Sequence, residues 1–110
     1  MATALNVFKT VTANVTTTTT TVYTAPTGYT TVVLLAQVSN TSNAVMTVSS
    51  DHVRSGISTN LLTDGVLPTN DALNLLSGKL VLNTGDAITI IGSADSSAQM
   101  LLSILETANP

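Results

Sequence analysis

The sequence predicts an all-β protein that folds as a single antiparallel β-sandwich of the jelly-roll type, with seven to eight short strands. Short apolar stretches alternate with polar turns at intervals of about 8 to 12 residues, which is typical of sandwiches and jelly rolls. In addition, 44% of the residues are hydrophobic but only 8% are charged, against about 25% charged in an ordinary soluble domain. Threonine, serine and asparagine supply the remaining polarity, and they favour strands and turns over helices.

Residues 29–40 are predicted to form the central strand of the core. Residues 32–36 are apolar without a break and rich in β-branched side chains, with threonines before them and polar residues after them. A short run of this kind indicates a strand that is covered on both faces. The closing strand, residues 98–105, is also apolar on both sides: one stripe contains Ala98, Met100, Leu102 and Ile104, and the other contains Leu101 and Leu105. We therefore expect the two strands to pair or stack.

The first quarter of the chain is expected to contribute two strands. Residues 4–12 alternate, with Leu5, Val7 and Val11 on one face and Phe8 on the other, and residues 13–14 are a plausible turn. Six consecutive threonines at 16–21 lie between valines. Threonine is β-branched and stiff at χ1, so this tract is predicted to continue as a strand with a polar surface. Residues 25–28 should turn, with proline fixing φ and glycine available where φ is positive.

The middle of the chain is less regular. Residues 40–43 are predicted to turn into a strand at 44–50, with a hairpin as the simplest connection. Residues 51–65 are expected to be a long loop or an edge region that includes a short strand at 57–62. Asp71 could cap one helical turn over residues 72–76, and an extended segment is the alternative.

The pattern is clearer in the last third of the chain. Residues 79–82 are predicted to form a strand with Leu80 and Leu82 facing inward, and Ile88 and Ile90 should share a face of the next strand. Residues 107–110 are expected to fray.

Length and charge limit the classes of protein to which this chain can belong. With 110 residues, one domain spanning residues 1–110 is expected, in which residues 1–12 form either an N-terminal arm or the first strand. The formal net charge is −3 and no basic run is present, so we do not expect nucleic-acid binding. No apolar stretch approaches the length of about 20 residues that a membrane helix needs, so we do not expect membrane insertion. A surface with so few charges does little to oppose self-association, which favours a homo-oligomer.

No motif indicates an enzyme, a cofactor or a structural metal, and the chain has no cysteine. Asp51 and His52 lie among serines, but neighbouring residues of a strand point to opposite faces, and no nucleophile elbow accompanies them. Asp64, Asp71 or Asp86 could bind calcium together with turn carbonyls, although no EF-hand spacing is present. Asp86 is expected to accept hydrogen bonds from its own turn, and Glu106 to pair with Lys79.

A candidate subunit-contact surface is formed by Thr16, Thr18, Thr20, Tyr23 and Tyr29, which we call the threonine–tyrosine surface. The alternative for the threonine run is an exposed strand near a sheet edge. Two tyrosines beside one turn could instead stack on a sugar ring, with the 51–65 segment completing a glycan site.

Four segments resemble a group of small virion accessory proteins of tailed bacteriophages. They are Thr21-Val22-Tyr23-Thr24-Ala25-Pro26-Thr27-Gly28-Tyr29-Thr30-Thr31-Val32-Val33, Val38-Ser39-Asn40-Thr41-Ser42, Gly78-Lys79-Leu80-Val81-Leu82-Asn83-Thr84-Gly85-Asp86-Ala87-Ile88 and Leu102-Ser103-Ile104-Leu105-Glu106. The resemblance spans most of the chain after residue 20, and its motifs mark turns and strand ends. It implies a β-sandwich subunit displayed on a phage particle.

The expected function is therefore that of a non-enzymatic structural protein of a tailed-phage virion, most simply a capsid decoration or cement subunit that stabilises the particle by binding only the assembled shell. The alternative is a neck, tail or fibre accessory module that binds a host glycan or another virion protein. Expected partners are like subunits, with a trimer as the expected oligomer, and the major capsid protein or other virion proteins. Such a protein would be made in the host bacterial cytoplasm and end in the virion.

Overall fold

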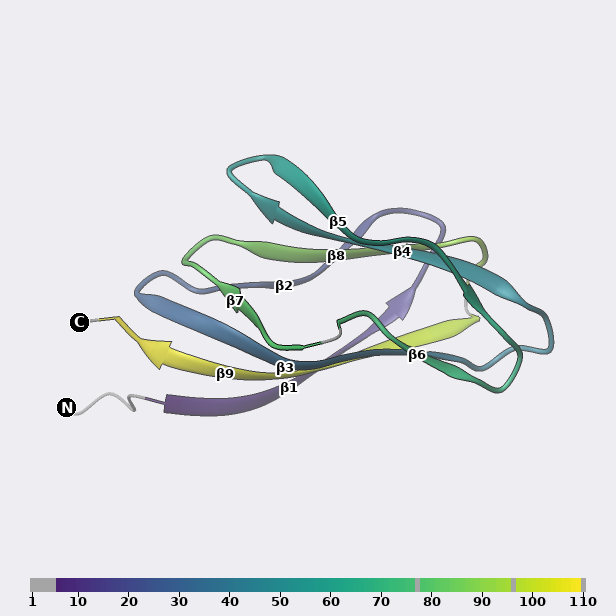
Figure 1. Cartoon of the computed structure of the whole chain (residues 1–110), viewed down its shortest axis with the longest axis horizontal. Helices are drawn as coiled ribbons and strands as arrows, with labels where there is room; N and C mark the ends of the chain where they lie inside the picture. The colour runs from purple at the N-terminus through teal and green to yellow at the C-terminus, as the bar shows by residue number, and fades with distance from the viewer. Residues whose placement is uncertain (1–5, 77, 96, 110) are drawn as a thin grey trace.

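A computed structural model describes residues 6–76, 78–95 and 97–109, and in these residues the chain forms nine strands in two antiparallel sheets (Figure 1). The strands are β1 (Asn6–Val15), β2 (Thr20–Thr24), β3 (Tyr29–Asn40), β4 (Met46–Arg54), β5 (Ile57–Leu67), β6 (Ala72–Asn74), β7 (Leu80–Leu82), β8 (Ala87–Gly92) and β9 (Ala98–Ala108). The predicted all-β sandwich is confirmed.

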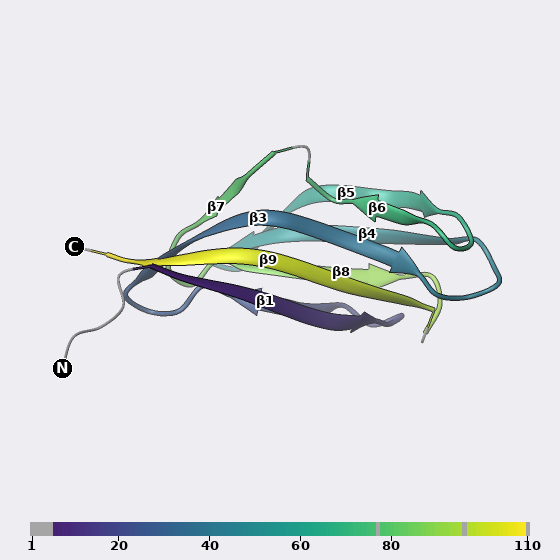
Figure 2. The same cartoon turned by 90° about the horizontal axis from the view of Figure 1, so that it is seen from below.

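The topology is that of a jelly roll. One sheet has the order β1-β9-β3-β6, with β7 also paired to β3, and the other has the order β2-β8-β4-β5. Strand β6 pairs with one part of β3 and β7 with another, so together they act as one interrupted strand. This interruption explains why the structure has nine strands where seven to eight were predicted. Figure 2 shows the five-stranded sheet from its outer side, with the other sheet behind it.

The core lies between the two sheets and is built from alternate residues of their strands. Ala98, Met100, Leu102 and Ile104 of β9 are all at most 1% exposed, as the predicted stripe requires. Ile88 and Ile90 face them from β8, and Leu82 is buried at the end of β7. Strand β3 pairs with β9 along nearly its whole length. The predicted central strand and its pairing with the closing strand are therefore confirmed.

The threonine tract does not form one strand, and the predicted turn at 13–14 does not occur. Strand β1 continues to Val15, residues 16–19 make a bend that carries the chain to the other sheet, and β2 begins at Thr20. The tract bends because its hydroxyls and an aspartate satisfy the backbone there: Thr18 donates its amide to the Thr16 hydroxyl at 3.2 Å, and Thr17 donates its amide to Asp95 at 2.7 Å. Burial of Val15 at the end of β1 fixes where the strand ends.

Residues 40–43 do not connect a hairpin. Strands β3 and β4 lie in different sheets, so this segment is an arch across the end of the sandwich. The Asn40 side chain holds the arch by donating to the carbonyls of Ala44 at 2.8 Å and Leu67 at 3.0 Å, while its own oxygen accepts from the Ser42 amide at 2.8 Å. A sequence pattern that indicates a turn does not show whether the next strand stays in the same sheet.

Residues 51–65 are not a loop. Strand β4 runs through Arg54, Ser55 and Gly56 make a tight turn with φ of 52° and 79°, and β5 returns along β4 as the edge of the four-stranded sheet. Two successive residues with positive φ are typical of the type I′ turn that suits a twisted hairpin. The edge region and the strand at 57–62 were thus predicted correctly, but the long loop was wrong.

Two further segments differ from the prediction. Residues 72–74 are extended as β6, where one helical turn was the first alternative, because they complete the ladder at the edge of β3. Residues 107–109 do not fray: β9 extends to Ala108, and Asn109 donates its amide to the Gly28 carbonyl at 2.9 Å and accepts from Thr30 at 2.6 Å. Leu5, Ser77 and Pro110 lie outside the described residues.

Strand β3 was predicted to be covered on both faces, and within the described residues it is covered on one. The four-stranded sheet covers the inner side, where Val33 and Val38 are fully buried. The outer side of the five-stranded sheet is open, and Leu35 of β3 and Leu101 of β9 are each 37% exposed there. Each of β3 and β9 therefore has a second set of apolar residues, which faces outward and gives the strand the sequence of one that is covered on both faces.

Truncating a core residue of β5 should cost far more stability than truncating its exposed neighbour. Leu67→Ala should lower the free energy of unfolding by about 2 to 5 kcal/mol because Leu67 is fully buried. Val66→Ala is the matched control, since Val66 is 62% exposed, and should cost less than about 1 kcal/mol. Urea denaturation of the two variants tests the sandwich arrangement, and equal losses would contradict it.

Candidate functional site

The threonines of the threonine–tyrosine surface bond to one another in the bend between β1 and β2. The Thr16 hydroxyl donates to the Thr18 carbonyl at 2.8 Å and lies 3.3 Å from the Thr20 hydroxyl, which itself donates to the Thr18 carbonyl at 3.1 Å. These hydroxyls hold the bend together. Thr18 remains exposed, whereas Thr16 and Thr20 are half-buried.

The two tyrosines do not extend that surface. Tyr23 lies on β2 with its hydroxyl directed to internal partners, and Tyr29 begins β3 in the opposite sheet. Tyr29 forms hydrogen bonds through its main chain: its amide donates to the Pro26 carbonyl at 3.1 Å, and its carbonyl accepts from the Thr84 hydroxyl at 2.7 Å. The structure therefore does not bring the five residues together as one surface.

The Tyr23 hydroxyl instead belongs to a polar cluster that joins the two sheets. It donates to Glu106 Oε2 at 2.6 Å and lies 2.8 Å from Thr31 Oγ1. Glu106 is 4% exposed, and its other oxygen accepts from Lys9 Nζ at 2.9 Å. Lys9 of β1 is thus the partner of Glu106, in place of the predicted Lys79. Lys9 pairs with Ile104, two pairs along the ladder from the Val7–Glu106 pair, so the side chains of Lys9 and Glu106 are diagonal neighbours on one face of the sheet.

The electrostatics of this cluster follow from its burial and its hydrogen bonds. Burial and the hydrogen bond to Glu106 raise the pKa of Tyr23 to about 12. Burial alone would raise the pKa of Glu106, but the hydrogen bonds from Tyr23 and Lys9 outweigh it and leave the pKa below its usual value. At neutral pH the carboxylate is therefore charged and the phenol is neutral. This arrangement holds β2 against β9.

A second polar cluster surrounds Asp86 at the start of β8. The Asn83 amide donates to Asp86 Oδ2 at 2.9 Å, which confirms the predicted role of Asp86 in its own turn. The sequence prediction missed two further partners: Arg54 donates through Nε at 3.0 Å to both oxygens and through Nη2 at 2.6 Å, and His52 Nε2 lies 3.1 Å away. His52 and Arg54 are two residues apart on β4, so their side chains share a face. This shared face was not recognised from the sequence, because residues 51–65 were predicted as a long loop or an edge region.

The Asp86 cluster stabilises the turn that precedes β8. Hydrogen bonds from Arg54 lower the pKa of Asp86 well below its ordinary value, against the opposing effect of burial, and the Asn83 amide and His52 lower it further. The Ser50 hydroxyl donates to the Thr89 carbonyl at 2.7 Å, so it is engaged in the core. Among the described residues, no three His, Asp or Glu side chains are grouped so that they could hold a metal ion.

The outer side of the five-stranded sheet has the properties of a contact surface. Within the described strands, the side chains that alternate with core residues carry no charge. They are Asn6, Phe8, Thr10, Thr12 and Asn14 of β1, Gln99, Leu101, Ser103, Leu105 and Thr107 of β9, Thr30, Val32, Leu35, Gln37 and Ser39 of β3, Ala72 and Asn74 of β6, and Val81 of β7. We call this set the outer face.

Four apolar residues of the outer face lie in register across neighbouring strands. Phe8 pairs with Leu105, Leu105 with Val32, and Val32 with Val81. Phe8 is 73% exposed and Val81 is 53% exposed. This apolar row crosses the sheet near one end of β1.

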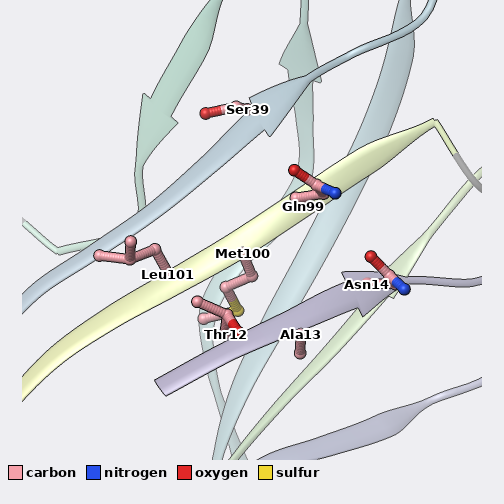
Figure 3. Close-up of a pocket in the computed structure, with 7 residues that line it drawn as sticks. All are labelled: Thr12, Ala13, Asn14, Ser39, Gln99, Met100 and Leu101. Atoms are coloured by element: carbon pink, nitrogen blue, oxygen red, sulfur yellow. The ribbon is translucent and has the colours of Figure 1, made fainter. Parts of the chain in front are cut away.

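Farther along the same strands, the outer face is hollowed. The hollow has a volume of about 430 Å³ and is lined by Thr12, Ala13, Asn14, Ser39, Gln99, Met100 and Leu101. Figure 3 shows these residues on β1, β9 and β3, with the amides of Asn14 and Gln99 on neighbouring strands. The lining is uncharged and mixes polar with apolar residues, among which Leu101 is partly exposed.

Comparisons with known proteins give a fold and no family. No family model and no curated protein matches the chain. A solved structure of Bacillus endospore appendages, described as a novel family of disulfide-linked pili, is similar with a TM-score of 0.59 at 12% identity, over 96% of this chain and 88% of that one. At this identity the similarity concerns the fold alone. In the described part of the chain, no helix has the length and apolar character needed to span a membrane.

Tyr23→Phe should lower the free energy of unfolding by about 1 to 3 kcal/mol, because it removes a hydrogen bond to a buried carboxylate. Tyr29→Phe is the matched control, since the hydrogen bonds of Tyr29 described above involve its main chain and are kept in this variant. Urea denaturation at neutral pH measures both. If the two variants lost the same stability, the Tyr23 hydroxyl would not be joining the sheets.

Asp86→Asn should destabilise the protein at pH 7, and the difference from the unchanged protein should shrink as the pH falls below about 4. The folded pKa of Asp86 is depressed, so its ion pairs contribute stability above the unfolded value of about 3.9 and lose it as the pH falls towards the folded value. Urea midpoints between pH 7 and pH 2 check this. Asp64→Asn, at an exposed carboxylate that contacts Ser49, is the control, and a similar pH-dependent difference there would contradict the assignment.

Proposed function

We propose that this chain is a non-enzymatic structural subunit that assembles with copies of itself on a larger particle. The observation that supports the proposal best is the outer face, which is uncharged, partly apolar and open although β3 and β9 have the sequence of doubly covered strands. Exposed apolar patches of this kind mark contact surfaces in soluble proteins. The polar clusters at Glu106 and Asp86 are internal and stabilise the sandwich.

The particle we propose is the virion of a tailed phage, with the chain as a capsid decoration subunit. The support is the resemblance of its turns and strand ends to phage accessory proteins. Two of those motifs meet in the fold: the Ala25 amide donates to the Asp86 carbonyl at 2.8 Å, and the Gly85 amide donates to the Ala25 carbonyl at 3.0 Å. The residues of the two motifs therefore share one structural role, because both turns close the same end of the sandwich.

The alternative is an accessory or adhesion module of the neck, tail or a fibre. The fold also occurs in the Bacillus structure described as disulfide-linked pili, and the 110 residues here contain no cysteine with which to form such links. Glycan binding through both tyrosines is less favoured by the geometry, because the Tyr23 hydroxyl is already engaged by Glu106 and Thr31.

Locating the protein on particles tests the proposed place of action. Mass spectrometry of purified virions should detect the chain, and electron microscopy of particles lacking it should show missing density on the head, with a shell that is less resistant to heat. Missing density on the neck or tail would favour the alternative. Absence of the protein from purified virions would refute both.

The purified protein should self-associate, and its association should depend weakly on sodium chloride. With only 8% charged residues, there is little electrostatic attraction or repulsion for salt to screen, whereas sulfate should strengthen burial of the apolar outer face. Sedimentation across a range of protein and salt concentrations measures the native mass and compares it with the expected trimer. A monomer at every concentration would contradict self-assembly.

A further inference from the structure

We infer that the outer face is a two-fold interface between two copies of this chain, with the symmetry axis crossing the sheet along the row that contains Thr10, Ser103 and Leu35. The inference rests on the proposed self-assembly and specifies which surface performs it. Thr10 pairs with Ser103, and Ser103 pairs with Leu35, so the three residues lie in register across β1, β9 and β3.

The first argument is the mismatch between sequence and coverage. Two-sided apolar strands are ordinarily buried on both faces, and here β3 and β9 lie side by side with one face open. Leu35 and Leu101 are each 37% exposed on that face. A second layer packed on it would complete the burial that the sequence pattern indicates, in the way that two sheets pack face to face.

The second argument is that the outer face is complementary to itself. A two-fold interface uses the same patch on both partners, so each protrusion must meet a recess elsewhere on that patch. Phe8 is the most exposed large apolar residue of the face, and the hollow beside Thr12 and Leu101 lies four residues along β1, or roughly 13 Å. The Thr10 row is midway between the apolar row and the Thr12 row. Rotation about it places Phe8 of each copy over the edge of the other copy's hollow.

The same rotation brings apolar residues together at the centre. Leu105 of one copy lies over Leu101 of the other, because their rows are equally distant from the axis on β9. Leu35, on the axis row, faces its own counterpart. The smaller side chains of Thr10 and Ser103 on that row let the sheets approach.

The third argument is charge. The outer face carries no charged side chain within the described strands, and Lys79, just before β7, lies beside it in a hollow that Leu35 also lines. The strands themselves therefore bring no like charges together when two copies approach. A different partner would gain no electrostatic recognition from this surface. A closed assembly that uses this two-fold contact contains an even number of subunits. If the subunits also form the expected trimer, two trimers joined through the outer face make a hexamer.

The test introduces a charge on the axis. Thr10→Asp places two carboxylates opposite each other, which should weaken self-association by at least about tenfold because facing like charges are strongly unfavourable. Ser58→Asp is the matched control: it adds the same charge at an exposed position of β5 in the other sheet, and should leave association unchanged. Sedimentation measures both variants, and circular dichroism checks that they are folded.

A single introduced cysteine gives a second readout in a chain that has none. Thr10→Cys should be joined to its own counterpart by a short bismaleimide that spans the separation of about 10 Å between packed sheets, and the product should stop at the dimer. Ser58→Cys should give far less product under the same conditions. This experiment decides the question if Thr10→Asp fails to fold.

The outcomes separate the inference from the proposed function. If the unchanged protein associates but neither Thr10→Asp nor Thr10→Cys differs from its control, the two-fold face is refuted and self-assembly through another surface stands. If the unchanged protein is monomeric throughout, both are refuted. Loss of association in Thr10→Asp alone, together with dimer crosslinking in Thr10→Cys alone, supports the two-fold interface.

Discussion

The pairing of β3 with β9 is the constraint on which the rest of the structure depends. It runs from Tyr29 opposite Ala108 to Asn40 opposite Ala98 and brings together segments about 70 residues apart in the chain. Its inner side supplies Val33, Val38 and the fully buried stripe of β9 to the core. Once this ladder is in place, β1 can add to the free edge of β9, and β6 and β7 to the free edge of β3. Every other element either extends this sheet or covers its inner side.

Two ion pairs, Lys9–Glu106 and Arg54–Asp86, help to close the sandwich. Glu106 links β9 to β1 through Lys9 and to β2 through Tyr23, whereas Asp86 ties the turn before β8 to β4 through Arg54 and His52. In both cases a nearly buried carboxylate is satisfied by several donors, which is the condition under which a buried charge is tolerated. The described strands of the outer face carry no charged side chain, which supports the proposed role in assembly.

Much of the fold could be predicted from periodicity, and the exceptions share one cause. The stripes of β8 and β9 follow from alternation, and the central position of β3 follows from its unbroken apolar run at 32–36. The threonine tract, the arch after Asn40 and the β4–β5 hairpin were misjudged because their polar residues suit turns and strands equally well. Distant partners decided them: Asp95 for the bend, Leu67 for the arch and the β4 ladder for the hairpin. The Arg54–Asp86 contact was missed for the same reason.

By itself, the sequence determined the fold class, the central and closing strands, and a surface poor in charge. These properties depend on composition and on local patterns of apolar residues, both of which can be read directly from the sequence. Only the tertiary structure decided which sheet each strand joins, that Tyr23 points inward to Glu106, and that Phe8, Leu105, Val32 and Val81 form one exposed row. Those depend on register between strands far apart in sequence, and register is fixed by side chains that meet only when the sandwich closes.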